Sequence, residues 1–123
     1  MGRPIRILLV EDNKVFREAL ELLLGLRVDV EIVAAVGDGA AAAPAAELYQ
    51  PDVVLMDYRL PGMDGVQATA AVREAHPEIG VVCLTASANA REIEALYEAG
   101  AAECLTKDQE LDEIVAALKR AAA

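Results

Sequence analysis

The chain has few aromatic residues, few basic residues and no long hydrophobic run, and each of these features excludes some classes of protein. Tryptophan is absent and aromatics make up only 3% of the 123 residues, so the core must be aliphatic. Acids outnumber bases by 21 to 11, giving a net charge of -10, which argues against a domain that binds nucleic acid directly. No apolar stretch is long enough for a signal peptide or a membrane span, so we expect a cytoplasmic protein with no membrane partner.

Cysteine and histidine are also scarce. Cys83 and Cys104 are too few, and too far apart in sequence, for a disulfide framework or a zinc site. Both lie in apolar segments, so we expect them to be reduced and buried. His76 is the only histidine and precedes Pro77 at the end of a predicted helix, which indicates a surface loop position.

What the chain does contain is an alternation of apolar segments with segments of helical periodicity. Strands are predicted over residues 5–10, 28–36, 53–57, 79–84 and 101–106. Helices are predicted over residues 14–26, 65–75, 88–99 and 110–121, and an alanine-rich helix ending at residue 49 either begins near Pro44 or bends there. Short apolar strands alternating with helices predict one α/β domain over residues 1–123, a doubly wound three-layer sandwich around a parallel sheet.

Polar residues stand where four of the predicted strands end. They are Glu11, Asp12, Asp57, Thr85 and Lys107. The carboxyl ends of parallel strands share one edge of a sheet, where open α/β proteins bind ligands, so we expect these side chains to meet in one cleft.

The charges in such a cleft do not balance. Two carboxylates about 4 Å apart repel by roughly 4 kcal/mol at an effective dielectric near 20, and one lysine cannot neutralise three acids. A hard divalent cation, which binds oxygen ligands, would neutralise the acids, and Mg²⁺ fits best. An oxygen of Asp57 then becomes a feasible nucleophile toward phosphorus, with Lys107 and the Thr85 hydroxyl stabilising the phosphoryl oxygens.

These residues carry a resemblance to a known family. The chain resembles the receiver domain of two-component response regulators over essentially its whole length, through ILLVEDN, PDVVLMDYRLPGMDG, VVCLTAS and AAECLTKD. The resemblance implies a flavodoxin-like (βα)5 fold with strand order 2-1-3-4-5. It also implies that Asp57 is phosphorylated, with Mg²⁺ held by Asp12, Asp57 and the main-chain carbonyl of Arg59, and by Glu11 through water.

The resemblance also implies partners. Thr85 and Lys107 would contact the phosphoryl group, and a sensor histidine kinase or a histidine phosphotransfer protein would donate it. The segments RLPGMDG, LTAS and TKDQELDEIVAAL are similar to receivers that carry a LuxR-type helix-turn-helix output domain. No basic DNA-binding segment is present, so the chain would be an excised receiver or a single-domain regulator. The face made by the fourth helix, fifth strand and fifth helix could support a phosphorylation-dependent homodimer.

Some positions depart from the family pattern, and others fall where this family tunes its switch. Cys104 stands where such receivers usually carry an aromatic residue coupled to the threonine, so either Thr85 shifts alone or another group fills the space. Arg59, Ala86 and Ser87 fall at switch or tuning positions. The Arg59 side chain could block attacking water or point to solvent.

Two other functions stay open at this point. The first is a Mg²⁺-dependent phosphatase that passes through an aspartyl phosphate, although such enzymes usually place an acid where Arg59 stands. The second is an interaction module that works without phosphorylation, which Cys104 alone suggests. Under the receiver interpretation the chain is no enzyme in the ordinary sense, because it catalyses only its own phosphorylation and dephosphorylation.

Overall fold

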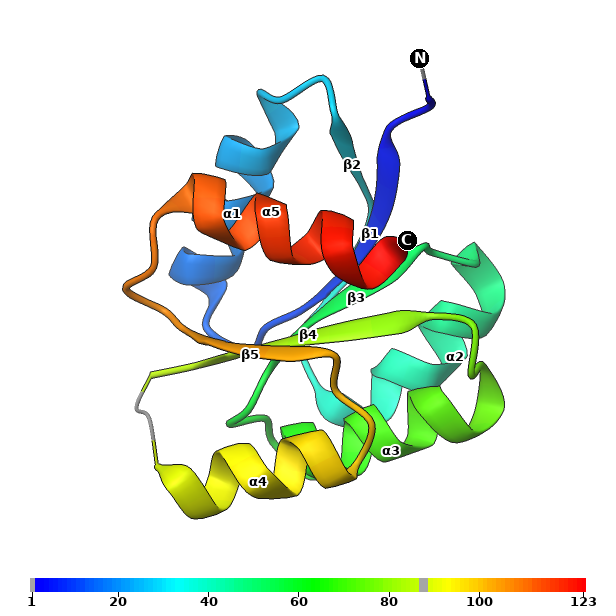
Figure 1. Cartoon of the computed structure of the whole chain (residues 1–123), viewed down its shortest axis with the longest axis vertical. Helices are drawn as coiled ribbons and strands as arrows, with labels where there is room; N and C mark the ends of the chain where they lie inside the picture. Colours follow the sequence, from blue (N-terminus) through cyan, green and yellow to red (C-terminus); the bar gives the residue numbers. More distant parts are fainter. Residues whose placement is uncertain (1, 87–88) are drawn as a thin grey trace.

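The computed structural model describes residues 2–86 and 89–123 (Figure 1). Its strands are β1 (Ile5–Val10), β2 (Val30–Val36), β3 (Val53–Asp57), β4 (Gly80–Thr85) and β5 (Glu103–Thr106). Its helices are α1 (Lys14–Gly25), the short 3₁₀ helix η1 (Gly39–Ala41), α2 (Ala42–Tyr49), α3 (Gly65–Ala75), α4 (Ala90–Glu98) and α5 (Leu111–Ala122). All strands pair in parallel in the order β2-β1-β3-β4-β5, which confirms the flavodoxin-like topology.

The central strands are buried on both faces, as expected for a sheet between two helix layers. Successive residues of β1 and β3 point to opposite sides: Leu8 and Val54 pack with α2, α3 and α4, whereas Ile7 and Val53 pack with α1 and α5. Figure 1 shows this division, with α1 and α5 on one side of the sheet and α2, α3 and α4 on the other. The three-layer sandwich is therefore confirmed.

Several element ends differ slightly from the predicted ones. β2 begins at Val30, and Val28, which the sequence predicts to lie in the strand, is 92% exposed. Pro44 lies in the first turn of α2, so this helix begins near the proline and is not bent by it. α4 begins at Ala90 after Asn89, whose side chain accepts a hydrogen bond from the Arg91 amide, and its predicted start at residue 88 lies outside the described residues.

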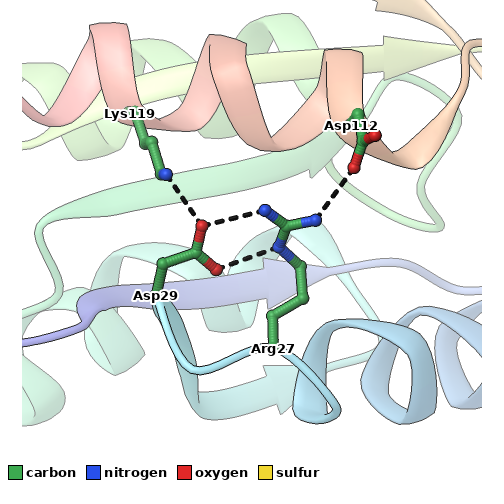
Figure 2. Close-up of polar contacts among 4 residues, drawn as sticks. All are labelled: Arg27, Asp29, Asp112 and Lys119. Atoms are coloured by element: carbon green, nitrogen blue, oxygen red, sulfur yellow. Dashed lines mark hydrogen bonds and ion pairs between the residues drawn. The ribbon is translucent and has the colours of Figure 1, made fainter.

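A network of charged residues fixes α5 to the turn between α1 and β2 (Figure 2). Arg27 donates two parallel hydrogen bonds to Asp29, each 2.9 Å long, and its third nitrogen lies 2.9 Å from Asp112. Lys119 lies 2.7 Å from the same Asp29 carboxylate. Arg27, and then Lys119, hold the pKa of Asp29 well below its ordinary range. α5 is thus attached at two points along its length.

His76 does not occupy a surface loop as predicted. It ends α3 but is only 9% exposed, because it lies between α2 and the residues that lead into β4. Its Nε2 atom is 2.9 Å from the Glu47 carboxylate and its Nδ1 atom is 3.6 Å from that of Glu78. In the described ranges, no helix combines the length and apolar character that crossing a membrane requires.

Candidate functional site

The residues predicted to converge do so at the carboxyl edge of the sheet. Asp57 is the last residue of β3 and Thr85 the last of β4, while Glu11 directly follows β1 and Lys107 directly follows β5. These four strands are neighbours in the sheet. The main chain tightens the arrangement, because the Lys107 amide donates a 2.9 Å hydrogen bond to the Thr85 carbonyl.

Lys107 bridges the two buried carboxylates. Its Nζ atom is 2.9 Å from Glu11 and 3.2 Å from Asp57, whose exposed fractions are only 1% and 4%. The ammonium group also lies 4.7 Å from the centre of the Phe16 ring, a cation–π contact that fixes the end of the long side chain. The second Glu11 oxygen accepts a 3.0 Å hydrogen bond from the Asn13 amide.

The charged form of Asp57 is disfavoured in this arrangement. Burial, and then repulsion from Glu11, raise the pKa of Asp57 from 3.8 to about 7, although Lys107 opposes the change. Burial acts to lower the pKa of Lys107, but the bonds to Glu11 and Asp57 outweigh it and raise that pKa. The site therefore has one firmly held cation and an excess of negative charge.

The donor set suits a hard divalent cation. Glu11, Asp12 and Asp57 each offer a carboxylate oxygen within 4.8 Å of the others. Asp12 is exposed and faces a hollow of about 450 Å³, which is lined by Asp12, Tyr58, Arg59, Leu60, Pro61 and Asp64. Clustered carboxylates beside open, water-accessible space match the preference of Mg²⁺ for oxygen ligands and retained waters.

The segment after β3 is held closely against the sheet edge. A Cβ atom on Gly65 would lie 2.6 Å from the Asp57 carbonyl oxygen and 2.7 Å from the Tyr58 Cα atom, so only glycine lets α3 begin there. The Gly65 amide donates a 2.7 Å hydrogen bond to the Tyr58 carbonyl. Asp64 and Gln67 complete a reciprocal capping box at the start of α3. The segment carrying Arg59 is thereby fixed at both ends.

The next residues are those predicted to tune the switch, Arg59, Ala86 and Ser87. Arg59 has an exposed side chain whose guanidinium lies 5.9 Å from the centre of the Tyr58 ring, and Ala86 is also exposed. Ser87 lies outside the described residues. Sequence reasoning missed the role of Tyr58, whose hydroxyl interacts with Glu92 of α4, an interaction that raises the pKa of that hydroxyl.

The two cysteines are neighbours, which their separation in sequence concealed. Cys83 and Cys104 are register partners in the β4–β5 ladder. Cys83 is fully buried as predicted, whereas Cys104 is only partly buried, because β5 is an edge strand. The Cys104 amide donates a 3.2 Å hydrogen bond to the hydroxyl of Tyr97, a residue of α4.

The fold and this edge together define a class: a flavodoxin-like α/β domain with an acidic cluster and a bridging lysine at the carboxyl ends of its strands. The sequence model of the family described as the response regulator receiver domain matches residues 7–119, and the chain belongs to this family. It is thus a response regulator receiver domain of two-component systems.

Similar proteins agree with this assignment. The chain is 38% identical over 114 residues to the probable transcriptional regulatory protein NarL of Mycobacterium tuberculosis, covering 93% of this chain and 53% of NarL. It is 31% identical over 115 residues to the transcriptional regulatory protein DegU of Brevibacillus brevis, covering 94% of this chain and 49% of DegU. It therefore spans about half the length of these curated relatives.

Solved structures give the same result. The signal receiver domain of NarL from Mycobacterium tuberculosis superposes with a TM-score of 0.93 at 36% identity, covering 98% of both chains. A DNA-binding response regulator of the LuxR family from Staphylococcus aureus superposes with a TM-score of 0.89 at 27% identity, covering 97% of this chain and 99% of that one.

Proposed function

We propose that the domain is a phosphoacceptor switch in which Asp57 takes a phosphoryl group from a histidine on a partner protein. The observation that carries the proposal is the position of Asp57: a buried carboxylate at a strand end, 3.2 Å from the Lys107 ammonium and clustered with Glu11 and Asp12. This arrangement supplies a nucleophile, a charge-stabilising lysine and a set of metal ligands at one edge.

In the proposed reaction, a carboxylate oxygen of Asp57 attacks the phosphorus of a phosphohistidine. An oxygen–phosphorus bond forms, the phosphorus–nitrogen bond breaks, and the imidazole leaves with its electron pair. Lys107 balances negative charge on the phosphoryl oxygens, and the Thr85 hydroxyl donates a hydrogen bond to one of them. Small acyl phosphates would replace the phosphohistidine in the same step.

Asp12, Asp57 and the main-chain carbonyl of Arg59 would hold Mg²⁺, with Glu11 assisting through water. When bound, the ion neutralises the carboxylates and shields the attacking oxygen from the phosphate charge. Because Lys107 already bridges Glu11 and Asp57, its ammonium would shift its contacts toward the phosphoryl group once Asp57 is modified.

The partners would be a sensor histidine kinase or a histidine phosphotransfer protein. Similarity to transcriptional regulatory proteins and to a DNA-binding response regulator of the LuxR family supports an output that involves DNA binding. Phosphorylation would change the face formed by α4, β5 and α5, and this face could pair two copies of the chain.

The test is phosphorylation of the purified chain with acetyl phosphate, followed by intact mass spectrometry. We expect one phosphoryl group to be added with Mg²⁺ and none with EDTA. Asp57→Asn should abolish the gain, whereas Asp108→Asn, which alters an exposed acid beside Lys107, should retain it. Phosphorylation that survives Asp57→Asn would overturn the proposal, and steady turnover of a generic phosphate ester would favour a phosphatase instead.

A further inference from the structure

The β4–β5 ladder places two thiols directly side by side. Cys83 and Cys104 are register partners, and both point to the face of the sheet covered by α3 and α4, since Cys104 packs against the cluster that contains Cys83. Interaction between the two thiols raises the pKa of Cys83 and lowers the pKa of Cys104. The Cys83 sulfur also lies 3.7 Å from the Thr69 hydroxyl in the buried layer.

The two thiols differ in access and in acidity. Cys83 is completely buried, whereas Cys104 is partly open to solvent beside Tyr97. The hydrogen bond from Cys83, aided by one from Tyr97 and opposed by burial, lowers the pKa of Cys104. The thiolate is the reactive form of cysteine, so Cys104 is the one that an oxidant in solution meets first.

We propose that Cys83 and Cys104 are a redox pair that forms a reversible disulfide across β4 and β5 on exposure to hydrogen peroxide. The Cys104 thiolate attacks one oxygen of hydrogen peroxide, the oxygen–oxygen bond breaks, and Cys104 becomes a sulfenic acid. The leaving hydroxide takes up the proton that the thiol released and departs as water. The Cys83 sulfur then attacks the Cys104 sulfur, a disulfide forms, and the hydroxyl leaves as a second water. Two thiols are oxidised and one hydrogen peroxide is reduced.

The strand geometry brings the cysteines within reach. Neighbouring strands lie about 4.7–4.9 Å apart, inside the Cα separation of about 4.4–6.8 Å that disulfides require. Parallel strands hold their Cβ atoms side by side, so closing the bond draws the two strands together locally. A bond formed under that tension is easily reduced, which suits a reversible device.

Cys83 is placed for the second step because it lies directly beside Cys104 in the β4–β5 ladder, although it reacts as a thiol and not as a thiolate. The pKa of its thiol is raised well above the usual range, first through its hydrogen bond to Cys104 and then through burial. The disulfide would join β4, which ends in Thr85, to β5, which Lys107 directly follows, so it would fix the spacing of the two strands at this part of the site edge.

The test treats the whole chain with hydrogen peroxide and then alkylates it with iodoacetamide under denaturing conditions. We expect both alkylation sites to disappear together, with a mass lower by two hydrogen atoms and full recovery in dithiothreitol. A non-reducing gel should show monomer only. These readouts do not depend on phosphorylation, so they can fail or succeed separately from the proposed function.

Two variants make the test specific. In Cys83→Ala, Cys104 should accumulate as a sulfenic acid that dimedone traps, because its resolving partner is gone. In Cys104→Ser, the buried Cys83 should stay reduced. Retention of both thiols in the unmodified chain, dimedone labelling equal to that of Cys83→Ala, or disulfide-linked dimers would overturn the proposal. Circular dichroism confirms that each variant is folded before it is scored.

Discussion

Replacing Asp57 by asparagine should stabilise the metal-free domain, although it removes the proposed phosphorylation site. The Asp57 carboxylate is buried beside Glu11, and its pKa in the folded chain is raised from 3.8 to about 7. An amide of nearly the same shape carries no charge and avoids that penalty.

The size of the effect follows from the pKa. A carboxyl whose pKa rises on folding keeps its proton longer in the folded state, so stability is lost as pH rises from about 4 to about 7. The full change from 3.8 to about 7 corresponds to about 4 kcal/mol at pH 8. Local relaxation of the charged site reduces this figure, so we expect Asp57→Asn to gain about 2–4 kcal/mol at pH 8. The gain should fall toward zero near pH 3–4.

The assay is urea unfolding in EDTA, followed by far-ultraviolet circular dichroism between pH 4 and pH 8. Only the difference between the two proteins is interpreted, because many other acids titrate in the same range. Glu94→Gln, on the exposed surface of α4, controls for the loss of one negative charge from a chain of net charge -10. A gain that stays constant with pH, or an asparagine variant less stable at pH 8, would refute the reasoning.

Three further perturbations test other parts of the structure. Adding Mg²⁺ at pH 8 should stabilise the unmodified chain by about 3 kcal/mol at a hundred times the dissociation constant and should leave Asp57→Asn nearly unchanged, as measured by the same urea titration. Gly65→Ala should lower the free energy of unfolding by about 1–3 kcal/mol and weaken Mg²⁺ binding measured by calorimetry, because the added Cβ atom meets backbone atoms of residues 57 and 58. The matched control is Gly25→Ala, where a Cβ atom meets nothing within 4 Å, and this change should be neutral or slightly stabilising. Asp29→Asn should lower the urea midpoint at low ionic strength, and the deficit should shrink as sodium chloride is added, since salt partly screens ion pairs that are open to solvent on one side. A deficit independent of salt would mean that packing, and not charge, is lost.

The fold and most of the site could be predicted because both depend on local patterns. The apolar runs of β3 and β4 indicate strands buried on both faces, which requires helices on both sides of the sheet. Parallel strands then bring every carboxyl end to one edge, so Asp57, Thr85 and Lys107 had to meet there. Pro44 illustrates the limit of this reasoning, since the sequence allowed a helix start or a bend and only the structure decided between them.

What could not be predicted depends on register and on contacts distant in sequence. The pairing of Cys83 with Cys104 needs the alignment of β4 with β5, and a shift of one residue would place the thiols on opposite faces. His76 looked like a loop residue because the approach of α2, with Glu47, is invisible along the chain. The clustering of Arg27 with Asp112 likewise requires knowing that α1 and α5 share one side of the sheet.

The two attachments of α5 have a mechanical consequence. Asp112 and Lys119 are seven residues apart, or about 10 Å along the helix axis, and both are tied to the same short turn through Arg27 and Asp29. A helix held at two points can rotate about the line that joins them, but it cannot tilt or slide without breaking one of the two contacts. Any displacement that reaches α5 from Asp57 should therefore appear as a rotation of the helix at low ionic strength. As salt weakens the two ion-pair contacts, α5 should become free to tilt as well.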